Sequence, residues 1–180
     1  MPRPIFNSEH EKKLAEIIRV DHAGELGANR IYAGQIQYTK DKEQKKLLIH
    51  MLDQELEHLD YFAKEIAKGK SRPTALMPIW NLGGYLLGAI SAKIDPKTAM
   101  LVTEAVEEVI ENHYQQQIDY LKASGEKGKL LQKIKKFKQD ETEHKHIAMD
   151  NHSSKAKFAK IGKELVKKIC QGAIFLSKKI

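Results

Sequence analysis

The chain has 180 residues, of which 41% are hydrophobic and 31% charged, with a formal net charge of +7. This length can bury one full-sized core, and long stretches of Leu, Ile, Ala, Glu, Lys and Gln favour a helical chain without a domain break. The single cysteine, Cys170, excludes an intrachain disulfide and any multi-cysteine zinc or iron–sulfur site. We therefore expect one all-α domain over residues 1–180, in which metal chemistry would depend on Glu, Asp and His.

Hydrophobic periodicity and turn signals predict six helical segments. A Ser8 to Glu11 capping box opens the first segment, and an Asp95-Pro96 pair opens the segment that follows the crossover. Four long segments with an apolar crossover in the middle are typical of a four-helix bundle. The expected ranges are about 8–39, 41–67, 75–94 (the crossover), 96–123, 129–151 and 156–178 (a basic amphipathic helix).

A repeated acidic motif lies on the four bundle segments. A lone glutamate is followed by Glu-x-x-His, 30 residues later in the first half of the chain and 34 residues later in the second half. This is the form that a carboxylate-bridged two-metal site takes in a four-helix bundle, and the repetition indicates an internal duplication. The candidate metal ligands, which would also act in catalysis through the metals, are Glu25, Glu55, His58, Glu107, Glu141 and His144.

All of these candidates lie on the apolar stripe of their helix. Ionised carboxylates in a core are costly unless they are paired, and several that face one another also repel. The lysines lie mostly on the opposite faces, so protons or bound cations must balance the charge. Carboxylate oxygens and neutral imidazoles suit iron or manganese, and a histidine in each half favours iron that reacts with oxygen.

A tyrosine follows each lone glutamate by seven residues, at Tyr32 and Tyr114. Two interpretations remain open for both: a core aromatic, or a residue that lines a substrate pocket. For Tyr114, support of the metal ligands from behind is a further interpretation. Several acidic residues near the motifs fall off the apolar stripes and are expected to face water or to form surface pairs. These are Glu57, Glu108, Glu111 and Glu143.

Residues 18–28, Ile-Arg-Val-Asp-His-Ala-Gly-Glu-Leu-Gly-Ala, resemble the opening motif of the demethoxyubiquinone hydroxylase family (Coq7/Clk-1 type). Later segments, including 140–144 and 170–176, resemble other parts of the family pattern, so the likeness covers nearly the whole chain. Some family members have Tyr where this chain has Leu26, a difference that need not affect the metals. The resemblance implies a ferritin-like di-iron monooxygenase whose iron ligands fall on the candidates named above.

The resemblance also implies the substrates. A hydroxyl from O2 would be added to the ring of 2-polyprenyl-3-methyl-6-methoxy-1,4-benzoquinol, a step towards ubiquinone. The electron donor would be NADH or another reductant, and the chain has no nucleotide fingerprint that identifies it. Gly24, Gly27 and Ala28 leave space beside Glu25, either for the quinone ring or for close helix packing, and both alternatives stay open.

Two segments suit a substrate that is dissolved in a membrane. The crossover is apolar, but Pro78, Asn81 and its glycines favour an interfacial helix, with Trp80 and Tyr85 near the headgroups. The tail over residues 153–180 carries eight lysines and one acidic residue, which accounts for the whole net charge. We expect the tail to bind an anionic membrane surface, although a solvated helix closing the bundle, or an interface with a lipid-binding ubiquinone-biosynthesis protein, fits the same pattern.

The start of the chain lacks an apolar stretch for secretion and is too acidic and too short for a transit peptide. We expect a peripheral protein on the cytoplasmic side of the cell inner membrane, and the sequence leaves a homo-oligomer open. A protein that acts on nucleic acid should carry Lys and Arg around the mouth of its site. Here the positive charge is concentrated in a tail that is also apolar, which argues against a nucleic-acid partner. The alternative functions are a ferritin-like iron-storage or peroxide-reducing protein, a di-iron tRNA hydroxylase, and a noncatalytic scaffold, which the intact ligand set makes the weakest.

Overall fold

The computed structural model describes residues 8–180, and within that range the chain is all-α, as the sequence predicts. Residues 1–7, on which part of the interpretation of the amino terminus rests, lie outside the described range. The assignment of the chain to one domain stays a prediction. The elements are α1 (Glu9–Tyr38), α2 (Lys42–Ala67), α3 (Met77–Ile94), α4 (Pro96–Ala123), α5 (Lys129–Asp150), the short 3₁₀ helix η1 (Ser153–Lys155) and α6 (Ala159–Lys179).

The predicted helix starts are accurate where a side chain caps the helix. The Ser8 hydroxyl accepts from the Glu11 N–H at 3.1 Å, and the Glu11 carboxylate accepts from the Ser8 N–H at 3.2 Å. The Asp95 carboxylate caps α4 by accepting from the N–H groups of Lys97 and Thr98. The last helix begins later than predicted because η1 precedes it and Phe158 adopts a left-handed conformation, with φ of 57°, directly before Ala159.

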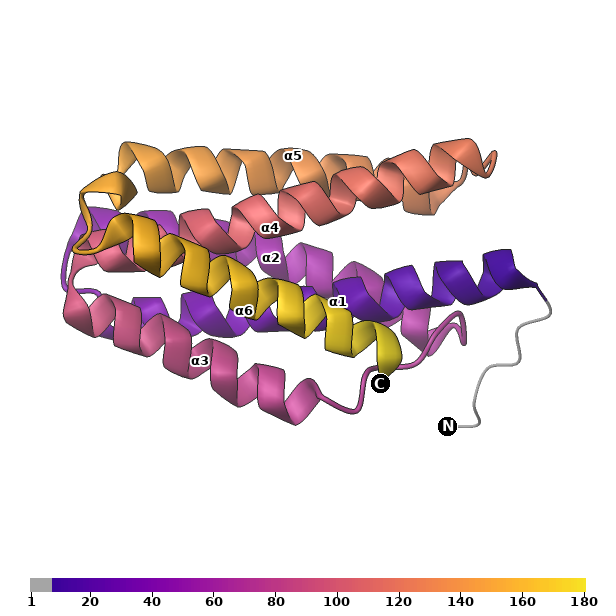
Figure 1. The fold of residues 1–180 in the computed structure, drawn as a ribbon, viewed down its shortest axis with the longest axis horizontal. Helices are drawn as coiled ribbons and strands as arrows, with labels where there is room; N and C mark the ends of the chain where they lie inside the picture. Colours follow the sequence, from indigo (N-terminus) through magenta and orange to yellow (C-terminus); the bar gives the residue numbers. More distant parts are fainter. Residues whose placement is uncertain (1–7) are drawn as a thin grey trace.

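Four of the helices, α1, α2, α4 and α5, run alongside one another as a bundle (Figure 1). The crossover helix α3 packs along α1, and α6 crosses the outside of α4 and α1 (Figure 1). The apolar stripes predicted for the bundle helices are largely the buried ones, although several of their residues are only partly buried, and in α5 Leu131 is buried in place of Leu130. The partly buried residues are Leu14, Ile36, Leu52, Ile110 and Leu130. Within residues 8–180, none of the helices combines the length and the apolar character needed to cross a bilayer.

Helices α1 and α3 approach closely because glycines remove the side chains between their backbones. A Cβ atom on Gly88 would collide with the carbonyl oxygen of Ile31, and one on Gly34 would collide with the carbonyl oxygen of Tyr85. Backbone atoms cannot move aside as a flexible side chain can. The register of α3 on α1 therefore depends on Gly34 and Gly88.

We expect Gly88→Ala to lower the free energy of unfolding by about 1–3 kcal/mol, because the new methyl group must push α3 away from α1. Gly83→Ala on the same helix is the matched control, since a Cβ atom there meets no atom within 4 Å. Alanine favours a helix over glycine, so the control is expected to be neutral or slightly stabilising. Urea unfolding followed by circular dichroism measures both, and equal midpoints for the two variants would contradict the expectation.

Candidate metal centre

The six side chains predicted as metal ligands meet in the middle of the bundle. Each comes from the buried stripe of its helix, and each is at most 1% exposed. Helices α1 and α4 provide one carboxylate each, while α2 and α5 each provide a carboxylate and an imidazole from one face. The residues are Glu25 on α1, Glu55 and His58 on α2, Glu107 on α4, and Glu141 and His144 on α5.

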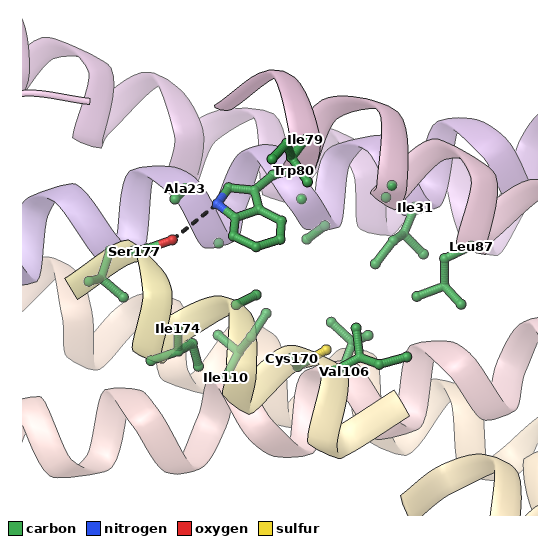
Figure 2. A pocket seen from close by; sticks show the side chains of 18 residues that line it. Ala23, Ile31, Ile79, Trp80, Leu87, Val106, Ile110, Cys170, Ile174 and Ser177 are labelled. Atoms are coloured by element: carbon green, nitrogen blue, oxygen red, sulfur yellow. Dashed lines mark hydrogen bonds between the residues drawn. The ribbon is translucent and has the colours of Figure 1, made fainter. Parts of the chain in front are cut away.

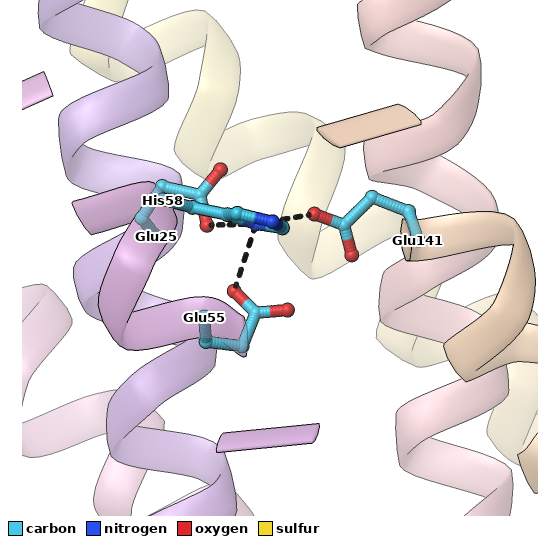
Figure 3. Close-up of side chains that lie close together, drawn as sticks. All are labelled: Glu25, Glu55, His58 and Glu141. Atoms are coloured by element: carbon cyan, nitrogen blue, oxygen red, sulfur yellow. Dashed lines mark ion pairs between the residues drawn. The ribbon is translucent and has the colours of Figure 1, made fainter. Parts of the chain in front are cut away.

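The cluster divides into two groups, and in each the candidate ligand atoms lie within 4.8 Å of one another. One group consists of Glu25, Glu55, His58 and Glu141. In Figure 3 its three carboxylates lie around the His58 ring. The other consists of Glu55, Glu107, Glu141 and His144. Two carboxylates, those of Glu55 and Glu141, therefore belong to both groups.

The shared carboxylates point one oxygen into each group. Glu141 places Oε1 3.3 Å from Nδ1 of His58 and Oε2 3.4 Å from Nδ1 of His144. Glu55 does the same, with Oε2 4.0 Å from His58 Nδ1 and Oε1 3.2 Å from His144 Nδ1. This arrangement can bridge two cations that lie side by side.

Each histidine is held from behind by a residue of the opposite motif. Nε2 of His58 lies 3.0 Å from the carboxylate of Asp140, and Nε2 of His144 lies 3.0 Å from the side-chain oxygen of Gln54. A hydrogen bond from Nε2–H fixes the ring and leaves Nδ1 to face the cluster. The sequence carries a signal for these partners that its interpretation missed, because each one directly precedes the shared glutamate of its helix.

Each of the two predicted tyrosines forms a hydrogen bond with a glutamate from the other half of the chain. The Tyr32 hydroxyl on α1 donates to Glu107 on α4 at 2.5 Å, and the Tyr114 hydroxyl on α4 donates to Glu25 on α1. Both rings are buried, at 1% exposure. Each tyrosine thus supports the lone glutamate of the opposite half, which a helix-by-helix pattern does not reveal.

The atoms that face the centre have no hydrogen-bond partner among residues 8–180. In that range, no lysine or arginine forms an ion pair with any of these carboxylates. Buried polar atoms normally have a hydrogen-bond partner. A cluster of carboxylates and imidazoles that face one another without such partners therefore requires bound cations or protons. The unpartnered atoms are Oε2 of Glu25, both oxygens of Glu55 and of Glu141, Oε2 of Glu107, and Nδ1 of His58 and of His144.

Without a metal, protons must carry the balancing charge. Burial, followed by repulsion from Glu141, raises the pKa of Glu55 and of Glu107 well above the usual value. Burial opposes a charge on His58 as well, but the hydrogen bond to Asp140 and the nearby carboxylates of Glu141 and Glu25 outweigh it and raise its pKa to about 12. For Glu25, the neighbouring His58 and the hydrogen bond from Tyr114 likewise outweigh burial and lower the pKa. The buried residues present therefore fit a pair of divalent cations.

The acidic residues predicted to lie off the stripes do so. Glu57 and Glu143 are exposed. Glu108 pairs with Lys163 and Lys167, and Glu111 pairs with Lys145. Two of the tail lysines therefore anchor α6 to α4, as expected for a helix that closes the bundle, while most of the others in the tail are exposed.

An apolar cavity of about 270 Å³ lies between α1, α3, α4 and α6 (Figure 2). Its wall includes Gly24, Gly27 and Ala28, which flank Glu25, and Val106, which precedes Glu107. A Cβ atom on Gly24 or Gly27 would meet no atom within 4 Å, so these glycines leave open space at the cavity, whereas Gly34, Gly84 and Gly88 permit the close packing of α1 and α3. Trp80 lines this cavity, with its indole N–H bonded to Ser177.

Comparison with known proteins agrees with this architecture. A family model described as "Ubiquinone biosynthesis protein COQ7" matches residues 12–177. The NADPH-dependent 3-demethoxyubiquinone 3-hydroxylase of Dictyostelium discoideum is 44% identical over 168 residues, which cover 93% of this chain and 77% of that protein. The human protein of the same name is 42% identical, covering 91% and 76%, and the 3-demethoxyubiquinol 3-hydroxylase of Rhodospirillum rubrum is 37% identical, also covering 91% and 76%. The chain belongs to the COQ7 family of ubiquinone biosynthesis proteins.

Proposed function

We propose that the protein is a 3-demethoxyubiquinol hydroxylase that uses O2 and two iron ions. Its substrate would be 2-polyprenyl-3-methyl-6-methoxy-1,4-benzoquinol, the substrate class named for the relatives. The observation that carries the proposal is the pair of ligand groups that share Glu55 and Glu141, buried next to an apolar cavity. Storage of iron requires no cavity of this kind, and the part of the cavity wall formed by residues 8–180 carries no cluster of Lys and Arg that would suit transfer RNA.

The six buried residues would hold the irons in two overlapping sets. Glu25 and His58 would bind one ion, Glu107 and His144 the other, and the shared glutamates would bridge them. The bound irons would supply the activation of O2 and the oxidising equivalents. The chain itself holds the ligands in place through the buried tyrosines and the partners of the histidines, and its apolar surroundings exclude water.

The overall reaction takes one oxygen atom of O2 into the ring and releases the other as water, which consumes two electrons and two protons from outside the substrate. Relatives in Dictyostelium discoideum and human are named as NADPH-dependent. We propose a reduced nicotinamide, NADH or NADPH, as the donor. Parallel assays with each nucleotide, and with a chemical reductant as the control, distinguish the two.

The decisive test is mass spectrometry of a methoxy-benzoquinol incubated with the iron-loaded, reduced protein under ¹⁸O₂. Incorporation of one labelled oxygen into the ring supports the hydroxylase. Oxidation of the iron and consumption of O2 without labelled product would instead indicate iron storage or peroxide reduction.

We further propose peripheral attachment to a membrane, the cell inner membrane on its cytoplasmic side, through the outer faces of α3 and α6. Leu82 and Ile90 of α3 are 62% and 56% exposed, and Ile161 and Leu165 of α6 are 71% and 59% exposed. These side chains belong to the two helices that enclose the outer side of the cavity. Exposed apolar side chains together with exposed lysines suit an anionic bilayer, and a lipid-binding protein or a second copy of the chain would compete for the same surface.

We expect the double variant Ile161→Ser, Leu165→Ser to lower partition onto anionic vesicles by about tenfold or more, since each buried aliphatic side chain stabilises binding by about 1.5 kcal/mol or more. Leu56→Ser is the matched control, because Leu56 is 49% exposed on α2, away from these helices. Vesicle flotation measures the partition. Equal flotation of the double variant and the control would count against attachment through α6.

A further inference from the structure

The cavity offers very few polar side-chain groups. Among the residues of the described range 8–180 that line it, only Trp80, Cys170 and Ser177 carry a side-chain hydrogen-bonding group. A quinol ring carries two hydroxyl groups and a methoxy oxygen, and burial of such groups is unfavourable unless they are hydrogen-bonded. The oxygens of a quinol ring in this cavity can therefore form hydrogen bonds with very few protein side chains.

Ser177 is prepared to donate a hydrogen bond. The Trp80 indole, which can only donate, gives its Nε1–H to the Ser177 hydroxyl oxygen at 3.1 Å (Figure 2). This bond takes one of the two lone pairs of the oxygen, and within residues 8–180 the structure gives the O–H group no acceptor of its own. Ser177 is only 2% exposed, so bulk water does not fill that role.

The end of α6 that carries Ser177 is fixed in place. The Arg19 guanidinium donates to the carbonyl oxygens of Ser177, at 3.0 Å, and of Lys178, at 2.8 Å. Arg72 donates to the carbonyl oxygen of Ile180 at 2.7 Å. A hydroxyl on such an anchored helix end can orient a ligand precisely.

Cys170 is the weaker alternative. Burial raises the pKa of its thiol to about 12, so it remains a neutral, weak donor. The thiol also stands among the aliphatic side chains of Val106 and Ile110 (Figure 2). It suits the apolar part of a ligand better than a ring oxygen.

We propose that Ser177, held by Trp80, donates a hydrogen bond to an oxygen of the substrate ring and so positions the ring in the cavity. The ring would lie over Gly24, where the absence of a side chain leaves room beside Glu25. The prenyl chain would extend towards the wholly apolar end, lined by Ile31 and Leu87. This assignment rests on the proposed function, because it takes the quinol as the ligand.

The single tryptophan of the chain makes the proposal directly measurable. Trp80 lines the cavity, so a quinone bound there quenches its fluorescence. A methoxy-benzoquinone with a decyl chain is titrated into the iron-loaded wild type, Ser177→Ala and Ser177→Thr. Loss of one hydrogen bond is expected to weaken binding about fivefold to tenfold in Ser177→Ala, while Ser177→Thr, which keeps a hydroxyl, stays within about twofold of the wild type.

Decylbenzene, which has the chain but no ring oxygen, is the matched control ligand. It competes for the cavity through apolar contacts alone, so its affinity should be equal in the wild type and Ser177→Ala. Equal quinone affinity in these two proteins, or an equal loss for both ligands, would overturn the assignment of Ser177.

The outcomes also separate this inference from the proposed function. Labelled oxygen in the product without saturable quenching of Trp80 would leave the hydroxylase standing and remove the ring from this cavity. Quenching that depends on the Ser177 hydroxyl, without labelled product, would support a quinone site and count against the hydroxylase.

Discussion

Glu141→Ala is expected to lower bound iron from the proposed two ions per chain to less than one and to reduce hydroxylation by more than about 100-fold. Loss of a residue that only supports a metal ligand typically costs about 10-fold to 100-fold, and loss of a ligand should cost more. Glu141 belongs to both ligand groups and places one oxygen near each histidine. Its removal therefore weakens both metal positions together, whereas loss of Glu25 would affect one. Iron analysis after gel filtration, together with the ¹⁸O₂ assay, measures both effects.

Glu143→Ala is the matched control for this variant. Glu143 lies on the same helix, its side chain is 55% exposed, and its nearest basic partner is His50 at 4.0 Å. Both iron content and activity are expected to be unchanged. Glu141→Gln, with almost the same shape and no charge, checks that the fold survives, because removing one buried carboxylate relieves repulsion in the metal-free protein. Two bound irons in Glu141→Ala would contradict the bridging role.

The buried cluster of six side chains could be predicted from the sequence because the position of each one depends on one helix at a time. A charged residue in the middle of an apolar stripe is a local signal, and Glu55 with His58 shows it within one turn. Helix starts were predictable for the same reason, since Ser8 and Asp95 cap their own helices. Information that is local in sequence was sufficient for these features.

The contacts between helices could not be predicted in this way. The periodicity places Tyr32 on the buried face of α1 but does not show that its hydroxyl reaches Glu107, 75 residues away. Glycines illustrate the same limit, because a Cβ atom on Gly24 would face open space at the cavity while one on Gly34 would collide with the backbone of α3, although both lie on α1. Which residue of another helix a side chain contacts depends on how the helices pack against each other. The hydrophobic periodicity of a single helix does not reveal that packing.

The metal-free protein is expected to lose stability as pH rises from about 6.5 to 8.5. The pKa of Glu55 and of Glu107 is raised by burial, and the pKa of His58 is raised to about 12, so the folded state retains protons that the unfolded chain has released. Stability from such groups is complete below their unfolded pKa and is lost as pH rises through the folded one. His113, whose burial lowers its pKa to about 4, acts in the opposite direction only below 6.5, which is why the range starts there.

Bound metal should remove this dependence, since cations replace the retained protons. Each retained proton contributes about 1.4 kcal/mol per pH unit, which for a chain of this size corresponds to about 3–6 °C in Tm. Chelator-treated protein should therefore melt at lower temperature at pH 8.5 than at pH 6.5, while protein loaded with Mn²⁺, which resists oxidation by air, changes little. The gap between the two forms should widen with pH. Glu55→Gln, Glu107→Gln should flatten the slope of the metal-free form, and a constant or rising Tm across this range would show that protons do not stand in for the metals.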